Sequence, residues 1–377
     1  MAGAVLVHDA KFGEFDFGPG HPLRADRVRL TFDLISAYGL LERRGVKTAE
    51  PEPASEARLL TVHDQPYLDA VKAVAAGREI EAPWRFGLGT ADNPIVPGLY
   101  DASALAVGGS VLAAELVFEG KASVAFNVGG GLHHAHRSRA AGFCIFNDPA
   151  IAIARLLELG GDGAKVAYVD LDAHHGDGVQ EAFYESDRVL TISLHESGRY
   201  LFPWSGEVDE IGRGRGEGYA VNVPLAPFTG DHVYLWAFRQ IVPPLLEAFE
   251  PDFVVTQLGA DTHYLDPLTH LALSTSGYLQ AVRALKRLAP RWVALGGGGY
   301  EMSVVPRAWT LAFGVMAQAR LPAEIPESQA HLYEKSGGRL RDRQAIGLHE
   351  EHERDVKAFA QASVEALRAA VFPIHGL

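Results

Sequence analysis

The fold is indicated most directly by residues 166–178, which read VAYVDLDAHHGDG. The first four are apolar and include two β-branched valines, as is typical of a strand buried on both faces of a parallel sheet. Polar residues begin where this strand would end, and ligands of open parallel sheets bind outside the carboxyl ends of the strands. The segment therefore predicts a central strand of an α/β fold with a polar site at its end.

Similar apolar runs recur along the chain, separated by segments with helical periodicity. This alternation predicts a parallel sheet between layers of helices. The predicted strands are residues 4–8, 122–127, 166–170, 189–194, 253–257 and 292–295. The predicted helices are residues 24–38, 102–118, 149–159, 231–249, 275–288 and 350–371, the last one polar and amphipathic.

The length of 377 residues and a hydrophobic share of 47% fit one large α/β domain and exclude a disordered chain. The strand pattern is lost from about residue 321 onward. We therefore expect a catalytic domain over residues 1–320 and a C-terminal extension over residues 321–377, whose helix docks on the same domain. The oligomeric state is left open by the sequence.

The net charge of −13 and the absence of long Lys/Arg runs argue against a nucleic-acid partner. The single cysteine, Cys144, excludes a disulfide framework and a Cys₂ or Cys₄ zinc site, and fits a reducing compartment. The N-terminal residues lack the basic region of a signal peptide. No stretch is expected to reach the roughly 18 apolar residues of a membrane span. We expect a cytoplasmic protein without a membrane partner.

Residues Asp170, Asp172 and His174 alternate along an extended segment, so their side chains can share one face. Buried charges at a strand end are costly unless they are paired or bind a cation. Asp172 and His174 with one further ligand would form a three-ligand site with an open position, as in catalytic zinc sites. Asp261, which follows another apolar strand, is the best third ligand, although a helix cap would also explain it.

The pair His133-His134 follows three glycines at the end of a further predicted strand. Adjacent imidazoles there could act as general base and acid or as metal ligands. Asp170 and Asp177 are plausible partners for their ring N–H groups. His136 and His175 have no such argument, and His8, His21, His63, His195 and His263 are expected to be structural or surface residues.

Tyr300 follows four glycines, Gly296 to Gly299. A phosphate loop is disfavoured because no Lys-Ser/Thr follows the glycines. The tyrosine hydroxyl could stabilise a developing oxyanion, or the ring could be a packed aromatic. No Gly-x-Ser-x-Gly segment occurs, and Cys144 lies between apolar residues as a buried, inert thiol would. Water activated by a metal remains as the nucleophile.

Together these motifs resemble the zinc-dependent histone deacetylase superfamily, most of all its bacterial acetoin-utilisation (AcuC-type) and histone-deacetylase-like members. The resemblance covers about residues 4–320. It rests on the following segments: GLHHA (131–135), GFC (142–144), ND (147–148), YVDLDAHHGDG (168–178), QLGADT (257–262), DP (266–267) and GGGGY (296–300).

The resemblance implies the arginase/deacetylase fold, with a central eight-stranded parallel sheet and helices on both sides. It further implies zinc, or iron in its place, bound by Asp172, His174 and Asp261. His133 and His134 would be the catalytic pair, supported by Asp170 and Asp177, and Tyr300 would polarise the acetyl carbonyl. The implied activity is hydrolysis of the acetyl or acyl amide of lysine side chains in a protein or peptide substrate, which releases acetate.

The resemblance extends to the substrate channel and to two monovalent-cation sites for potassium or sodium. Phe143 and Phe202 would form the channel walls, Gly142 would supply a carbonyl, and Asp92 would hold the substrate backbone. The first cation site would use Asp170, Asp172, His174, Ser193 and Leu194. The second would use Phe183, Ser186, Val189 and Tyr219.

Three other functions remain to be weighed. An acetylpolyamine hydrolase would use the same chemistry, but similar polyamine-selective proteins can carry an acidic residue where this chain has Leu268 after Asp266-Pro267. An arginase-like ureohydrolase would need two manganese ions and more carboxylates than the segment around Asp261 supplies. A non-catalytic acyl-lysine binder would lack a catalytic residue, and none is missing.

Overall fold

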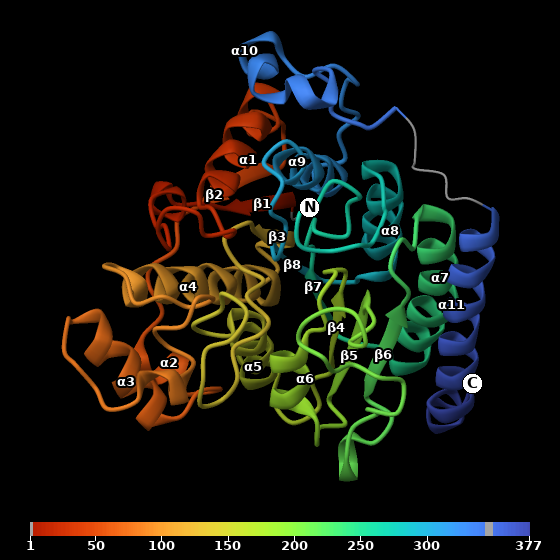
Figure 1. Cartoon of the computed structure of the whole chain (residues 1–377), viewed down its shortest axis with the longest axis horizontal. Coiled ribbons are helices and arrows are strands. Elements are labelled where there is room, and N and C mark those ends of the chain that lie inside the picture. The colour runs from red at the N-terminus through yellow and green to blue at the C-terminus, as the bar shows by residue number, and fades with distance from the viewer. Residues whose placement is uncertain (1–2, 344–349) are drawn as a thin grey trace.

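The computed structural model describes residues 3–343 and 350–377. Within them, an eight-stranded sheet forms the centre of the molecule (Figure 1). The strand order is β2-β1-β3-β8-β7-β4-β5-β6, and every neighbouring pair is parallel, as predicted. The strands are β1 (Gly3–Val7), β2 (Val46–Ala49), β3 (Ala122–Asn127), β4 (Val166–Asp170), β5 (Val189–Glu196), β6 (Ala220–Leu225), β7 (Phe253–Gln257) and β8 (Trp292–Leu295).

The two strands that the sequence pattern did not indicate, β2 and β6, are the edges of the sheet. β2 is short, and the side chains of Lys47 and Thr48 are exposed. β6 contains Asn222 and Pro224, and proline is tolerated at an edge because it cannot donate to the ladder. Edge strands therefore lack the unbroken apolar run that marks the central ones.

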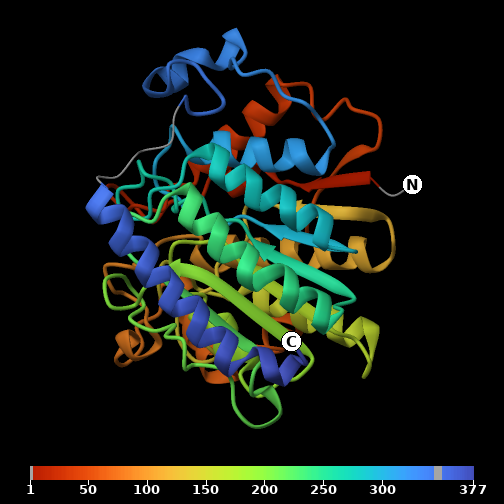
Figure 2. The same cartoon turned by 90° about the vertical axis from the view of Figure 1, so that its right-hand side faces the viewer.

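Helices cover both faces of the sheet. α4 and α5 pack on one face, whereas α1, α9, α8, α7 and α11 form a row across the other. Figure 2 shows three of this row side by side, α11 in blue, α7 in green and α8 in teal. The helices are α1 (Asp26–Ala37), α2 (Glu56–Leu59), α3 (Gln65–Ala75), α4 (Leu99–Phe118), α5 (Asp148–Gly160), α6 (Asp177–Phe183), α7 (Asp231–Phe249), α8 (Thr275–Leu288), α9 (Val305–Met316), α10 (Glu327–Ala330) and α11 (Glu350–Ala370).

Helix α4 corrects one expectation. Its 20 residues are long and apolar enough to cross a membrane by length and composition, although no segment of that kind was expected. Its apolar character has a structural reason, since it packs against α5 and β3, and residues such as Val107, Ala113 and Val117 are fully buried. A helix that is apolar on most of its faces is typical of a protein core.

The C-terminal helix α11 covers the edge of the sheet that is formed by β6. It contacts β6 and α7, and the Ser363 hydroxyl donates a 2.9 Å hydrogen bond to the Pro224 carbonyl of β6. Covering an edge strand in this way blocks pairing with another chain. The predicted extension, residues 321–377, includes residues 344–349, which lie outside the described residues.

The segment before α11 is anchored to the core through Asp342. Its carboxylate accepts hydrogen bonds from the Thr275 backbone N–H (2.8 Å), His263 (2.9 Å) and the fully buried Arg307 (2.9 Å). Burial disfavours the charged carboxylate, but His263 and Arg307 outweigh it and hold the pKa of Asp342 well below its usual range.

We expect Asp342→Ala to lower the free energy of unfolding by about 3–5 kcal/mol, because it leaves the Arg307 charge buried without its carboxylate. Urea unfolding measures this loss, with the exposed Asp162→Ala as control. Since the pKa of Asp342 is depressed on folding, its contribution is present above the unfolded pKa of about 3.9 and is lost as the pH falls further. Equal stability of the two variants at neutral pH would contradict this role.

Candidate active site

Four adjacent strands, β3, β8, β7 and β4, end at one edge of the sheet. The loops that follow them carry the polar motifs of the sequence. Because all four strands are parallel, their loops emerge on the same side and meet there. The loops are residues 128–147, 296–304, 258–274 and 171–176.

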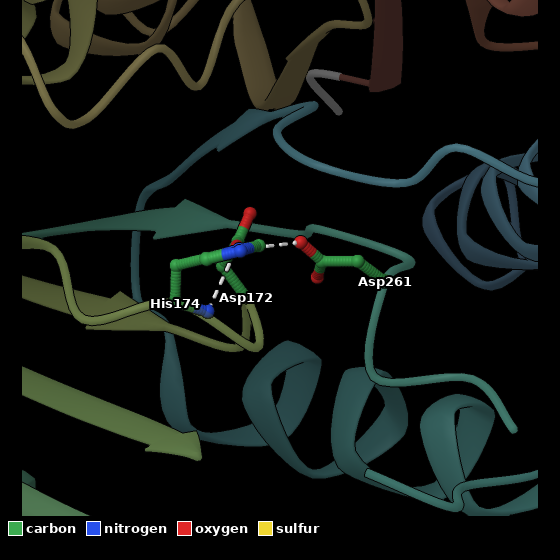
Figure 3. A group of neighbouring side chains, drawn as sticks. All are labelled: Asp172, His174 and Asp261. Atoms are coloured by element: carbon green, nitrogen blue, oxygen red, sulfur yellow. Dashed lines mark hydrogen bonds and ion pairs between the residues drawn. The ribbon is translucent and has the colours of Figure 1, made fainter. Parts of the chain in front are cut away.

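Asp172, His174 and Asp261 lie together at this edge, and all three are buried (Figure 3). Their candidate ligand atoms lie within 4.8 Å of one another. Nδ1 of His174 is 3.0 Å from Oδ1 of Asp172 and 3.0 Å from Oδ2 of Asp261. One ring hydrogen cannot point at both carboxylates, whereas one cation can contact all three side chains.

These three residues fit a divalent metal. Two ligands at about 2.0 Å from a tetrahedral zinc ion lie roughly 3.3 Å apart, close to the observed separations. Burial and the neighbouring Asp172 raise the pKa of Asp261 well above its ordinary value. Two buried carboxylates that repel each other in this way are stabilised by a bound cation. Carboxylate and imidazole ligands suit zinc and iron alike.

Two glycines leave the space that the carboxylates occupy. A Cβ at Gly259 would lie 2.4 Å from Oδ2 of Asp172, and a Cβ at Gly298 would lie 2.2 Å from Oδ2 of Asp261. Any other residue at these positions would displace the ligands. Asp261 caps no helix, because it lies in the loop after β7 and its Oδ1 accepts from the Ala173 N–H at 2.8 Å.

The tandem histidines contact the two aspartates that the sequence suggested as partners, one each. Nδ1 of His133 lies 2.7 Å from Asp170, and Nδ1 of His134 lies 2.7 Å from Asp177. Their Nε2 atoms are 3.0 Å apart. Asp170 also accepts from the Tyr168 hydroxyl at 2.7 Å, which fixes this carboxylate. Each imidazole is thus oriented by a carboxylate behind it.

The two imidazoles differ in proton affinity. Burial lowers the pKa of His133, but Asp170 and Asp172 outweigh it and raise the pKa to about 9. Burial and the positive charge of His133 lower the pKa of His134 to about 4. Neighbouring groups whose pKa values are pushed apart are suited to act as acid and base at one site.

No role was predicted for His136, but the structure places it in the same network. Its Nε2 lies 3.3 Å from Asp177, and its Nδ1 lies 2.6 Å from Glu181. Burial lowers the pKa of His136, but these two carboxylates raise it to about 9. Histidines at the alternate positions 134 and 136 were the sequence feature that could have indicated a role for His136. His175 lies behind the site instead and contacts Ser205 and Gln180.

Phe143 and Tyr300 are the aromatic residues that line a small cavity together with His133 and His134, and Phe202, the other predicted wall, packs against the His134 ring. The Phe202 ring lies 5.0 Å from that of His134, and the Phe143 ring lies 5.8 Å from that of Tyr300. Phe143 has a φ of 68°, which turns it into the cavity at a backbone cost. A Cβ at Gly142 would lie 2.4 Å from the His134 ring, so only glycine fits there. The cavity is lined by Leu23, Gly131, Leu132, His133, His134, Gly142, Phe143, Cys144, Asp172, Gly297, Gly298 and Tyr300.

Cys144 lines this cavity, whereas Asp92 and Leu268, the residues predicted at its rim, are not among the lining residues. Cys144 is buried, and burial raises the pKa of its thiol. The thiol therefore keeps its proton, as expected for an inert cysteine. Asp92 is exposed, and its carbonyl lies 3.1 Å from Nε2 of His21. The ring of His21, expected to be a structural or surface residue, lies edge-on against that of Phe143 at 4.7 Å, beside the channel wall. Leu268 is half-buried.

The residues of the two predicted potassium sites lie beside β4 and β5. Asp170 and Ser193 face each other in the β4–β5 register, and Leu194 follows Ser193. In the second group, the Ser186 N–H donates to the Phe183 carbonyl, and β5 begins at Val189. The carbonyl of Tyr219 accepts from Thr191, also on β5. A role in cation binding stays a prediction for both groups.

Comparison with known proteins agrees with this geometry. A family profile described as "Histone deacetylase domain" matches residues 21–316. The chain is 44% identical over 333 residues to "Acetoin utilization protein AcuC" of Bacillus subtilis (strain 168), covering 86% of this chain and 85% of the relative. It is 36% identical over 322 residues to human "Histone deacetylase 1", covering 85% and 65%.

A solved structure titled "Crystal structure of an HDAC homolog complexed with SAHA" superposes with a TM-score of 0.87 at 31% identity, covering 96% of this chain and 100% of that one. The arginase/deacetylase fold predicted from the sequence is therefore confirmed. With its family profile, its relatives and a buried metal-ligand triad in agreement, the chain belongs to the histone deacetylase family and is a metal-dependent deacetylase hydrolase.

Proposed function

We propose that this protein hydrolyses the acetyl amide of lysine side chains in proteins or peptides, with zinc as its metal. The observation that carries the proposal is that one cavity, lined by Phe143 and Tyr300, is also lined by Asp172 of the buried metal-ligand triad and by two histidines, each with its own aspartate. A narrow cavity with aromatic walls suits the extended, apolar stem of an acetylated lysine.

A zinc ion held by Asp172, His174 and Asp261 would supply a Lewis acid that lowers the pKa of water toward about 7 and polarises an acyl carbonyl. One imidazole of the His133–His134 pair takes a proton from the attacking water as general base. The proton is later delivered by a protonated imidazole to the leaving lysine amine. Asp170 and Asp177 hold the rings in place and stabilise the positive charge that forms on them.

Tyr300 faces the histidines across the cavity, with its ring 6.5 Å from that of His174. Burial and the neighbouring Asp261 and Asp172 raise the pKa of Tyr300 well above its ordinary value, so the phenol keeps its proton. Its hydroxyl can therefore donate to the carbonyl oxygen as negative charge develops there. Phe143 and Phe202 exclude water from the lysine stem, and Asp92 binds the substrate backbone at the rim.

Leu268 favours acyl-lysine over acetylpolyamine as substrate. It is half-buried and apolar at the position where a carboxylate would attract a second ammonium group. A ureohydrolase is disfavoured because, among residues 3–343 and 350–377, Asp172, His174 and Asp261 form the single cluster of three potential metal ligands, whereas two manganese ions need more.

A substrate panel tests this function. We expect the zinc-loaded protein to hydrolyse acetyl-lysine peptides with a kcat/KM at least about tenfold above that for acetylpolyamines, which corresponds to about 1.4 kcal/mol of selectivity. Leu268→Glu is expected to shift this ratio toward polyamines. Activity should be lost on chelation and return on addition of zinc, while the unfolding temperature of the chelated protein shows that it stays folded. Activity that survives chelation, or two manganese ions per chain, would reject the proposal.

A further inference from the structure

Tyr300 is the last residue of a glycine-rich loop segment, residues 296–300, in which no other residue has a side chain. The four glycines before it cannot pack to fix its position, and Gly297 and Gly299 adopt φ angles of 137° and 128°. Hydrogen bonds between neighbouring side chains and the loop backbone hold the loop in place instead. Arg27 donates to the Gly297 carbonyl at 2.6 Å, and the Gly298 N–H donates to Asp172 at 2.7 Å.

The acceptor for the backbone N–H of Tyr300 lies in the neighbouring loop, which follows β7. The Tyr300 backbone N–H donates to Oδ2 of Asp266 at 2.8 Å. The other oxygen of this carboxylate, Oδ1, accepts from the backbone N–H of Leu268 at 3.0 Å. Asp266 is 9% exposed. One buried carboxylate thus joins the segment that carries Tyr300 to the segment that carries Leu268.

We propose that Asp266 is a positioning residue that sets the location of the Tyr300 hydroxyl in the substrate cavity. The proposal rests on the proposed function, because it takes the catalytic role of Tyr300 from there. A glycine-rich loop has many accessible conformations, and fixing the backbone N–H of its last residue removes much of that freedom. A misplacement of about 1 Å at a reacting group costs up to about 100-fold in rate.

The carboxylate form of Asp266 is required for this role, since only it offers an acceptor oxygen to each N–H. Its isosteric amide, Asn, has one acceptor and one NH₂ group, and the NH₂ group would face one of the two backbone donors. Burial raises the pKa of Asp266 to about 6, while the Leu268 and Tyr300 N–H groups favour the charged form. Asp266→Asn therefore breaks one of the two hydrogen bonds while the size and shape of the side chain stay nearly the same.

Asp231 offers a matched control. Its carboxylate also joins two segments by accepting from the Ser274 N–H (2.8 Å) and the Ser274 hydroxyl (2.6 Å), at the start of α7 and α8. It contacts none of the residues that line the cavity. Asp231→Asn thus breaks a similar hydrogen bond between two segments. It reproduces the loss in free energy of unfolding that such a change causes without acting on Tyr300.

The test is a double-mutant cycle with Tyr300→Phe, assayed on an acyl-lysine peptide whose electron-withdrawing acyl group keeps the slow variants measurable. Asp266→Asn is expected to lower kcat by about 10- to 100-fold. In the Tyr300→Phe background it should lower kcat by less than about twofold, because residues that act as a unit are not additive. Asp231→Asn should have the same small effect in both backgrounds.

A second readout does not depend on activity. In chains labelled with 3-fluorotyrosine, the ¹⁹F signal that disappears in Tyr300→Phe reports on Tyr300. Asp266→Asn should shift or broaden this signal, and Asp231→Asn should leave it unchanged. If Asp266→Asn does not fold at the assay temperature, Asp266→Ser replaces it under the same two criteria.

Equal loss of kcat from Asp266→Asn in both backgrounds, or a Tyr300 signal that neither Asp266→Asn nor Asp266→Ser changes, would overturn the proposal. A wild-type protein that deacetylates no peptide would instead refute the proposed function. In that case the ¹⁹F signal still decides whether Asp266 positions Tyr300.

Discussion

Replacing Asp261 with asparagine is expected to remove the bound metal and to lower kcat/KM by about 1,000-fold. The carboxylate supplies one of three protein ligands, and an amide oxygen carries no charge to balance the cation. Losing a Lewis acid removes several kcal/mol of stabilisation from the transition state, and about 4 kcal/mol corresponds to this factor. Metal content after dialysis and steady-state kinetics measure both effects.

The same variant separates metal binding from general stability. Added zinc should raise the unfolding temperature of the wild type, because a ligand that binds only the folded state stabilises it. It should have no such effect on Asp261→Asn. Asp231→Asn, which also exchanges a carboxylate for an amide, should keep both its metal and its response to zinc. An Asp261→Asn protein that retains one metal per chain would show that the triad is not the metal site.

Removing the imidazole of His134 is expected to lower kcat by about 100- to 10,000-fold, the usual contribution of a general acid or base. His134 lies 2.7 Å from Asp177 and 3.0 Å from His133, and its ring packs against Phe202, so it faces the substrate cavity. The metal ligands are untouched by His134→Ala, and metal content should stay at the wild-type level. Single-turnover kinetics on an acetyl-lysine peptide measure the loss in the chemical step.

The exposed His232→Ala in the first turn of α7 controls for the loss of a histidine elsewhere. Imidazole added to the buffer should restore part of the activity of His134→Ala, since the space left by the ring adjoins the cavity. Turnover that stays intact in zinc-loaded His134→Ala would refute a role for this residue in proton transfer.

The central strands and the long helices could be predicted from local patterns. β3, β4, β7 and β8 and helices α7 and α8 have the predicted bounds, because buried strands and amphipathic helices leave strong periodic signals. The strands β2 and β6 and the helices α2, α3, α6, α9 and α10 were not predicted. Several of these elements are short, and the apolar run of β6 is interrupted by Asn222 and Pro224. Contacts with neighbouring elements stabilise such segments more than their own sequence does.

The metal triad could also be predicted from the sequence. Asp172 and His174 alternate after one strand and Asp261 follows another, and parallel strands bring their carboxyl ends to one edge. Asp170 and Asp177 were expected as partners of the tandem histidines, but which aspartate contacts which histidine was decided by the structure. The contacts of His136 with Asp177 and of Asp266 with Tyr300 were not predicted, because nothing in the local pattern around His136 or Asp266 indicates their partners.

The sequence by itself determined the class of fold, the place of the site at the carboxyl ends of the strands, and the residues that bring chemistry there. These properties depend on short-range periodicity and on residue type, which every segment carries within itself. Only the tertiary structure decided which oxygen contacts which donor, that His21 lies beside the channel wall, and that Asp266 holds the loop of Tyr300. Such contacts depend on how loops from different strands pack together, and no single segment contains that information.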